Sequence, residues 1–260
     1  MSDKFKTINK EISRIKKESD VKTIVAVGSG KEAVTRAQGV DEGSGDDVID
    51  FVSRDKKGTS ELKDIDIFII TSEEEKNQLR QIKNVEDVEF DLNYFPLQVA
   101  EAMVDKKVQY FLEELVGGKI IYDPEGVGEK LKAEGQKAYD QGPAESTKGN
   151  LAYLKYNLEA NLKDIAGKNI EDSEAEMEFI FLANMWLKNL LVYYFKLNGM
   201  WVPKDKKMFG VIKEKDELLY NKLINFYQEK DPRLLKDIAS YVFYEDGIKL
   251  GDEMRFKFKF

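Results

Sequence analysis

Two aspartates separated by one apolar residue, Asp64 and Asp66, have the type and spacing for metal chemistry. They introduce the apolar run at residues 65–70, which predicts a strand, and the alternation of a strand puts both carboxylates on one face. Neighbouring carboxylates repel each other unless a cation lies between them, and oxygen ligands suit Mg²⁺, which also binds phosphate oxygens. The pair predicts a metal–nucleotide site; the alternative is an edge strand with one solvated face.

A glycine-containing turn, Gly28-Ser29-Gly30, follows a β-branched strand pattern at residues 21–27 and precedes a helix-compatible segment at residues 31–38. Glycines at a strand end let backbone N–H groups approach an anion closely, and the start of a helix adds a favourable dipole. We therefore expect this turn to bind phosphate oxygens.

A third acidic position lies further along the chain, in the strand pattern at residues 85–95. Glu89 and Asp91 are two residues apart, so they share one face of that strand. A further carboxylate from a neighbouring strand is what a two-metal phosphoryl-transfer site requires. The spacing alone does not separate the two acids.

These segments together resemble the nucleotidyltransferase superfamily of the DNA polymerase β type. Within it, the chain is most similar to the small bacterial antibiotic nucleotidyltransferases that modify aminoglycosides and lincosamides. Residues 20–127 carry the resemblance, including the segment 117–126, which is similar to the closing strand and turn of that catalytic domain. One departure is the 34-residue separation between Ser29 and Asp64, which is longer than in the family and predicts an insertion at about residues 39–60, with an extra strand at 47–53.

The resemblance implies an α+β fold, with a catalytic domain of mixed sheet and flanking helices at residues 1–127 and an up-and-down helical bundle that binds the acceptor at residues 128–260. It also implies roles for individual residues. Asp64, Asp66 and Asp91 would bind the metal; Gly28, Ser29, Gly30 and Lys207 would bind the triphosphate; Asp91, preferred for its match to the family pattern, or Glu89 would be the third acid.

The activity implied is transfer of a nucleoside monophosphate, AMP from ATP or the equivalent from another NTP, to a hydroxyl of a small molecule such as an aminoglycoside-type antibiotic. The reaction would need Mg²⁺ or Mn²⁺ and release pyrophosphate. Two alternatives stay open: a regulatory or antitoxin-like protein that binds nucleotide on the same fold, and an enzyme that modifies a protein hydroxyl. A homodimer is also left open.

The amino-acid composition restricts the binding partners and the catalytic groups that the protein can use. The net charge of −8 disfavours non-specific nucleic-acid binding and favours a cationic acceptor. The absence of cysteine excludes disulfides and thiolate metal sites, and the absence of histidine leaves carboxylates, lysine or tyrosine as general bases. The sequence shows neither a membrane-length apolar run nor the apolar core of a signal peptide, so we expect a cytoplasmic protein.

The second half of the chain is predicted to be helical, with four amphipathic segments that indicate a bundle. The acidic run at residues 171–178 is typical of a helix start, where acids favour the dipole. Alternatively, Glu174 and Glu178, one turn apart, bind ammonium groups of the acceptor. Residues 204–207 are expected to form a solvated turn, from which Lys207 could reach the triphosphate.

Overall fold

The computed structural model describes residues 3–18, 20–37, 64–72, 77–168, 171–244 and 246–250. The predicted insertion at 39–60 and the extra strand at 47–53 lie outside the described residues. The sequence also predicts a short helix capped by Ser72, and residues 73–76 of that segment likewise lie outside them. The chain forms two compact units, Met1–Gln141 and Gly142–Phe260.

The first unit contains a mixed sheet, as the sequence predicted, and its five strands lie in the order β3-β4-β2-β1-β5. The central pair β2–β4 is parallel, and the other neighbouring pairs are antiparallel. The strands are β1 (Val21–Val27), β2 (Ile65–Thr71), β3 (Leu79–Val85), β4 (Val88–Pro96) and β5 (Lys119–Tyr122).

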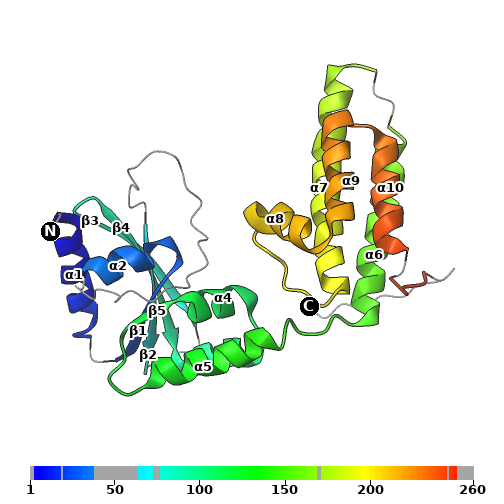
Figure 1. Cartoon of the computed structure of the whole chain (residues 1–260). Helices are drawn as coiled ribbons and strands as arrows, with labels where there is room; N and C mark the ends of the chain where they lie inside the picture. The colour runs from blue at the N-terminus through cyan, green and yellow to red at the C-terminus, as the bar shows by residue number, and fades with distance from the viewer. Residues whose placement is uncertain are drawn as a thin grey trace. The chain divides into compact units, whose positions relative to one another are not determined.

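Helices cover both faces of this sheet (Figure 1). On one face α1 and α2 contribute Ile8, Ile12 and Val34 to a core with alternate residues of the central strands, such as Ile67 and Leu92. Helices α3, α4 and α5 pack on the other face. The helices of the unit are α1 (Asp3–Ile15), α2 (Lys31–Ala37), α3 (Leu97–Asp105), α4 (Gln109–Gly117) and α5 (Val127–Asp140).

The division between the units falls after Gln141, whereas the sequence placed the domain boundary after residue 127. The difference is helix α5, which packs on β1, α3 and α4. Gly128 lies so close to this strand that a Cβ built on it would be 2.4 Å from Thr23 Oγ1. The helix therefore belongs to the sheet-containing unit.

Two predicted elements were wrong in extent. Residues 85–95 do not form one strand, because Glu86 and Asp87 form a tight turn between β3 and β4 with positive φ angles of 48° and 64°. Thr7 Oγ1 donates a 2.6 Å hydrogen bond to Glu86 Oε2, a tertiary contact that holds this unusual conformation. The sequence also predicts a single helix that begins at Pro96 and runs to Val116. The structure has two helices there, since Lys107 adopts a φ of 52° between α3 and α4.

The second unit is helical, as predicted (Figure 1). The four predicted segments correspond to α6, α7, α9 and α10, whose apolar faces share one core, and Trp186 Nε1 donates to the carbonyl of Leu158 at 2.8 Å within it. Residues 205–207, expected in a turn, instead form the first turn of helix α8. The helices are α6 (Lys148–Ala166), α7 (Ser173–Leu197), α8 (Asp205–Lys215), α9 (Glu217–Glu229) and α10 (Pro232–Phe243).

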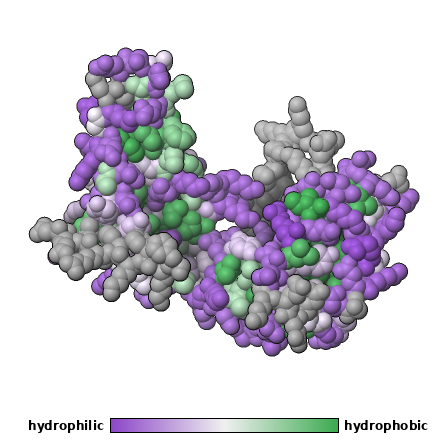
Figure 2. Space-filling model, turned by 180° about the vertical axis from the view of Figure 1, so that it is seen from behind, coloured by the Kyte–Doolittle hydropathy of each residue, from purple (hydrophilic) through white to green (hydrophobic). Residues whose placement is uncertain are grey.

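Hydrophilic residues predominate on the face drawn in Figure 2, and apolar residues appear there in separate groups. Within the part of the chain that the structure describes, every helix is too short or too polar to cross a bilayer.

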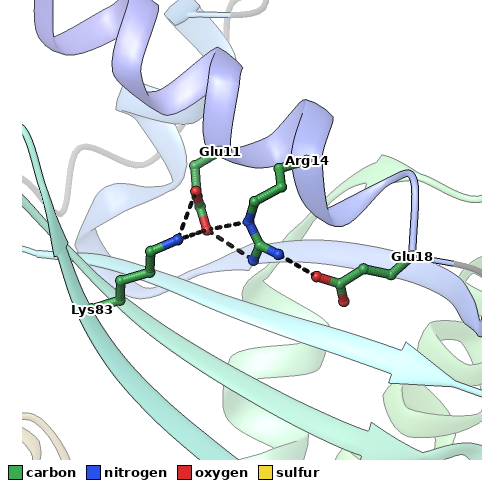
Figure 3. Close-up of polar contacts among 4 residues, drawn as sticks. All are labelled: Glu11, Arg14, Glu18 and Lys83. Carbon is green, nitrogen blue, oxygen red and sulfur yellow. Dashed lines mark hydrogen bonds and ion pairs between the residues drawn. The ribbon is translucent and has the colours of Figure 1, made fainter.

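A buried carboxylate joins α1 to the edge of the sheet (Figure 3). The side chain of Glu11 is only 5% exposed, and it accepts hydrogen bonds from Arg14 Nε at 3.0 Å and from Lys83 Nζ at 3.0 and 3.1 Å. Arg14 also pairs with Glu18. Burial acts to raise the pKa of Glu11, but the hydrogen bonds and charges of Arg14 and Lys83 outweigh it, so its pKa is lowered.

We expect Glu11→Gln to lower the free energy of unfolding at pH 7 by about 1.5–3 kcal/mol, since two cations lose a charged acceptor. Because the folded-state pKa is lowered, this stability is fully present above the unfolded-state pKa and is lost as pH falls through the folded-state pKa. The difference between the wild type and the variant in urea unfolding should therefore shrink at about pH 3. Glu18→Gln, at a more exposed partner of Arg14, is the control and should cost less than about 1 kcal/mol. A Glu11→Gln effect of equal size at both pH values would contradict this account.

Candidate functional site

The glycine turn and the Asp-x-Asp strand meet in the folded chain. Gly28 begins a 3₁₀ turn, Gly28–Gly30, directly after β1, and the antiparallel pairing of β1 with β2 places Val27 opposite Asp66. Gly28 has a φ of +62°, and a Cβ built on it would lie 2.5 Å from Asp66 Oδ2. Only glycine therefore allows both this backbone conformation and the close approach of the Asp66 carboxylate.

The second glycine of the turn packs on the start of the same strand. A Cβ at Gly30 would lie 3.0 Å from both the carbonyl oxygen of Asp64 and the Cα of Ile65. The 34 residues between Ser29 and Asp64 thus leave the turn and the two aspartates in contact. The side chain of Asp64 is in the segment immediately before β2 and is half-buried.

The third acid comes from the neighbouring strand. Parallel pairing of β2 with β4 puts Asp66 opposite Asp91, and in-register residues of adjacent strands project from the same face. Further along that face the rings of Phe68 and Phe95 pack with Phe111 of α4, with centroid separations of 4.9–5.6 Å. The two carboxylates therefore lie at the end of a rigid aromatic core, which fixes the strands that carry them.

A positive charge already lies on this acidic pair. Arg80 of β3 donates from Nε to Asp91 Oδ1 at 2.9 Å and from Nη2 to Oδ2 at 2.6 Å, and Asn93 Nδ2 donates to Oδ1 at 3.0 Å. The hydrogen bonds and charge of Asp91, followed by the charge of Asp66, raise the pKa of Arg80. Arg80 therefore interacts with both carboxylates, and sequence reasoning missed this residue.

The N–H group at the start of the turn also has a partner. Gly28 N–H donates to Glu114 Oε2 of α4 at 3.0 Å, so a carboxylate lies where the sequence predicted phosphate. Lys31 directly follows the turn as the first residue of α2, and its Nζ donates to the carbonyl of Gly117 at 3.1 Å. An anion that binds to Gly28 N–H must displace Glu114, and its charge would be favoured by Lys31.

The other predicted residues are distributed over the two units. Glu89 is exposed on β4, where its backbone pairs with Asn84, and Ser29 is within the turn. Lys207 is exposed in the first turn of α8, in the second unit. The roles predicted for these residues stay predictions.

The acidic run of the second unit is a helix start. Asp172 caps α7 by accepting a hydrogen bond from Ala175 N–H at 2.8 Å, and the acids that follow favour the helix dipole. Glu178 pairs with Lys168 at 2.7 Å, and Glu174 is exposed. Capping and the helix dipole therefore explain why this run is acidic, and acceptor binding by Glu174 and Glu178 stays a prediction.

The donor set fits one hard cation better than two. Among the described residues, no group of three or more acidic side chains is arranged to hold a metal ion. Mg²⁺, however, is commonly held by one or two carboxylates together with substrate phosphates. The Asp66 carboxylate lies beside the turn, and Asp64, whose backbone carbonyl lies at Gly30, directly precedes the same strand. Both oxygens of Asp91 are engaged by Arg80.

Comparison with known proteins supports the fold. No protein-family model matches the chain, and no curated protein matches it. The structure is similar to the crystal structure of a nucleotidyltransferase-like protein from Exiguobacterium sibiricum 255-15, with a TM-score of 0.50 and 12% sequence identity, over 92% of this chain and 74% of that chain. This likeness shows that the chain shares the α+β fold of that protein.

We expect Gly28→Ala to destabilise the first unit and to push the Asp66 carboxylate away by about 1 Å, because the added Cβ falls inside its contact distance. Gly126→Ala is the matched control, since Gly126 has a φ of +73° and its Cβ would meet nothing within 4 Å. Both variants carry the backbone penalty of about 1–3 kcal/mol, so any excess in Gly28→Ala reports the Asp66 contact. Urea unfolding measures it, and equal losses in both variants would show that this contact is unimportant.

Proposed function

We propose that the protein transfers a nucleoside monophosphate from an NTP, ATP in the first instance, to a hydroxyl of a small molecule and releases pyrophosphate. The observation that carries the proposal is the direct packing of the glycine turn on Asp66, with Asp91 in register on the next strand. A phosphate-binding turn and a carboxylate pair near one end of neighbouring strands are the parts that phosphoryl transfer needs. The fold likeness to a nucleotidyltransferase-like protein supports the same class.

The triphosphate would bind at the turn. Gly28 N–H would donate to a phosphate oxygen in place of Glu114, and Ser29 and Gly30 would contribute further N–H groups. Lys31 would add positive charge beside the turn, and Lys207 is the candidate cation of the second unit. Release of Glu114 removes a carboxylate that would otherwise repel the phosphates.

Asp64 and Asp66 would hold Mg²⁺ or Mn²⁺. When bound, such an ion neutralises charge on the triphosphate and aligns its oxygens for an in-line displacement. Gly28 serves this arrangement too, because its missing Cβ is what lets the Asp66 carboxylate lie over the turn.

The transfer reaction needs one bond formed at the α-phosphorus, one bond broken there and a base for the acceptor proton. The acceptor oxygen forms a bond to the α-phosphorus, the bond from that phosphorus to the oxygen bridging to the β-phosphorus breaks, and pyrophosphate leaves. The acceptor proton passes to a carboxylate, for which Asp91 and Glu89 are the candidates. Asp91 is in register with Asp66, which favours it, although the hydroxyl must then displace a hydrogen bond of Arg80.

One observation favours a second candidate function, a regulatory protein that binds nucleotide without transferring it. The site already contains an internal cation on Asp91 and an internal anion on Gly28 N–H. A protein that modifies a protein hydroxyl would share the chemistry and differ in the acceptor. Pyrophosphate release, measured with small-molecule acceptors and with a cell lysate, separates these functions.

We expect Asp66→Asn to abolish pyrophosphate release while the protein keeps its fold, because the side chain is half-buried near the beginning of β2 and is proposed to bind the cation. Asp64→Asn should have the same effect. Asp105→Asn, an exposed aspartate at the end of α3 in the same unit, is the matched control and should retain full activity. Circular dichroism checks the fold, and release at the wild-type rate by Asp66→Asn would rule out the metal role.

The acceptor is proposed to be hydroxylated and cationic, bound in part by Glu174 and Glu178 of α7. If this is so, acceptor affinity should fall when salt is raised from about 0.05 to 0.5 M, because screening shortens the reach of charges. The double variant Glu174→Lys/Glu178→Lys should weaken acceptor binding more than ATP binding, as measured by calorimetry for each ligand separately. Modification of neutral acceptors alone, or unchanged turnover in the double variant, would remove these glutamates from the acceptor site without touching the transfer reaction.

A further inference from the structure

The register of β2 and β4 creates an electrostatic requirement at the proposed metal site. Asp66 and Asp91 are direct neighbours on one face, and like charges at this separation disfavour each other unless a cation lies nearby. Arg80 supplies that cation from the edge strand β3, which places the backbone of Ile82 opposite Asp91 and that of Arg80 opposite Asn93. The requirement is thus met by the chain itself.

The contact between Arg80 and Asp91 is specific. A guanidinium matches a carboxylate in a planar two-point arrangement, and here Nε and Nη2 together engage both oxygens of Asp91. Asn93 holds Oδ1 from a second direction and in turn accepts a 2.9 Å hydrogen bond from Gln78 Nε2. The carboxylate is therefore oriented toward Arg80 by its neighbours.

The two partners differ in their freedom to move. The Asp91 side chain is 14% exposed, whereas that of Arg80 is 60% exposed. An exposed arginine can leave its partner without opening the core, while the carboxylate stays in place. The pair is thus arranged so that the cation can be exchanged and the acid cannot.

We propose that Arg80 is an internal counter-ion that competes with a divalent cation for Asp91. The protein then binds one divalent cation, through Asp64 and Asp66, and Asp91 takes part in binding a second cation only when Arg80 leaves it. Arg80 in this way sets how many metal ions the site holds. This inference rests on the metal site of the proposed function and adds the residue that limits it.

Titration of the full chain with Mn²⁺ alone, followed by electron paramagnetic resonance, tests the proposal without nucleotide or turnover. Wild type should bind one Mn²⁺, and Arg80→Gln should gain a second site or bind at least about tenfold more tightly, since a positive charge beside the carboxylates is removed. Arg80→Lys should lie between them, because it keeps the charge and loses the two-point contact. The double variant Arg80→Gln/Asp91→Asn should lose the gain.

Arg233→Gln is the matched control. Arg233 makes the same two-point contact, through Nε and Nη2, with Asp231 at the start of α10, and both residues belong to the second unit. Its Mn²⁺ binding should equal that of the wild type. Equal binding by wild type and Arg80→Gln, or two Mn²⁺ ions already bound by wild type, would overturn the proposal.

The result is separable from the fate of the proposed function. If the Mn²⁺ titrations behave as expected and no acceptor or lysate supports pyrophosphate release, the counter-ion stands and the transfer reaction fails. If transfer occurs and Arg80→Gln binds Mn²⁺ as the wild type does, the reverse holds. Thermal unfolding of Arg80→Gln checks its fold, and Arg80→Lys provides the same comparison with the charge retained.

Discussion

The parallel pairing of β2 with β4 is the constraint on which the site depends. It sets Asp66 beside Asp91 on one face of the sheet, where two carboxylates need a compensating positive charge. The aromatic packing of Phe68 and Phe95 further along the same strands keeps that register, because a shift of one strand by one residue would move its ring to the opposite face of the sheet and away from Phe111. Core packing and the acidic site are therefore two consequences of a single strand alignment.

The site as folded balances its own charges. Arg80 lies on Asp91 where a cation is needed, and Glu114 accepts from Gly28 N–H where an anion is favoured. Arg80 comes from β3 and Glu114 from α4, so neither partner belongs to the glycine turn or to the strands β2 and β4. A metal-bound nucleotide carries the same two kinds of charge, so its binding would exchange internal partners for external ones. Affinity would then depend on the cost of releasing two side chains as well as on the strength of the new interactions with the ligand.

The sequence predicted what local pattern controls. The strand patterns of β1 and β2, the glycine turn and the helical second unit all carry strong periodicity. It could not predict β3, whose residues are mostly exposed and lack alternation, and so it missed Arg80. The break between α3 and α4 was missed because residues 97–116 contain neither glycine nor proline. Likewise, the Glu86–Asp87 turn is held by Thr7, a contact distant in sequence.

The central claim is that Asp64, Asp66 and the glycine turn together form a metal–triphosphate site. A crystal structure with Mn²⁺ and a non-hydrolysable ATP analogue tests it most directly, because the anomalous signal of manganese locates the ion. The account predicts manganese within about 2.1–2.3 Å of carboxylate oxygens of Asp64 and Asp66, with the phosphates on Gly28 N–H and Glu114 displaced. An analogue bound away from the turn, or manganese without contact to either aspartate, would contradict it.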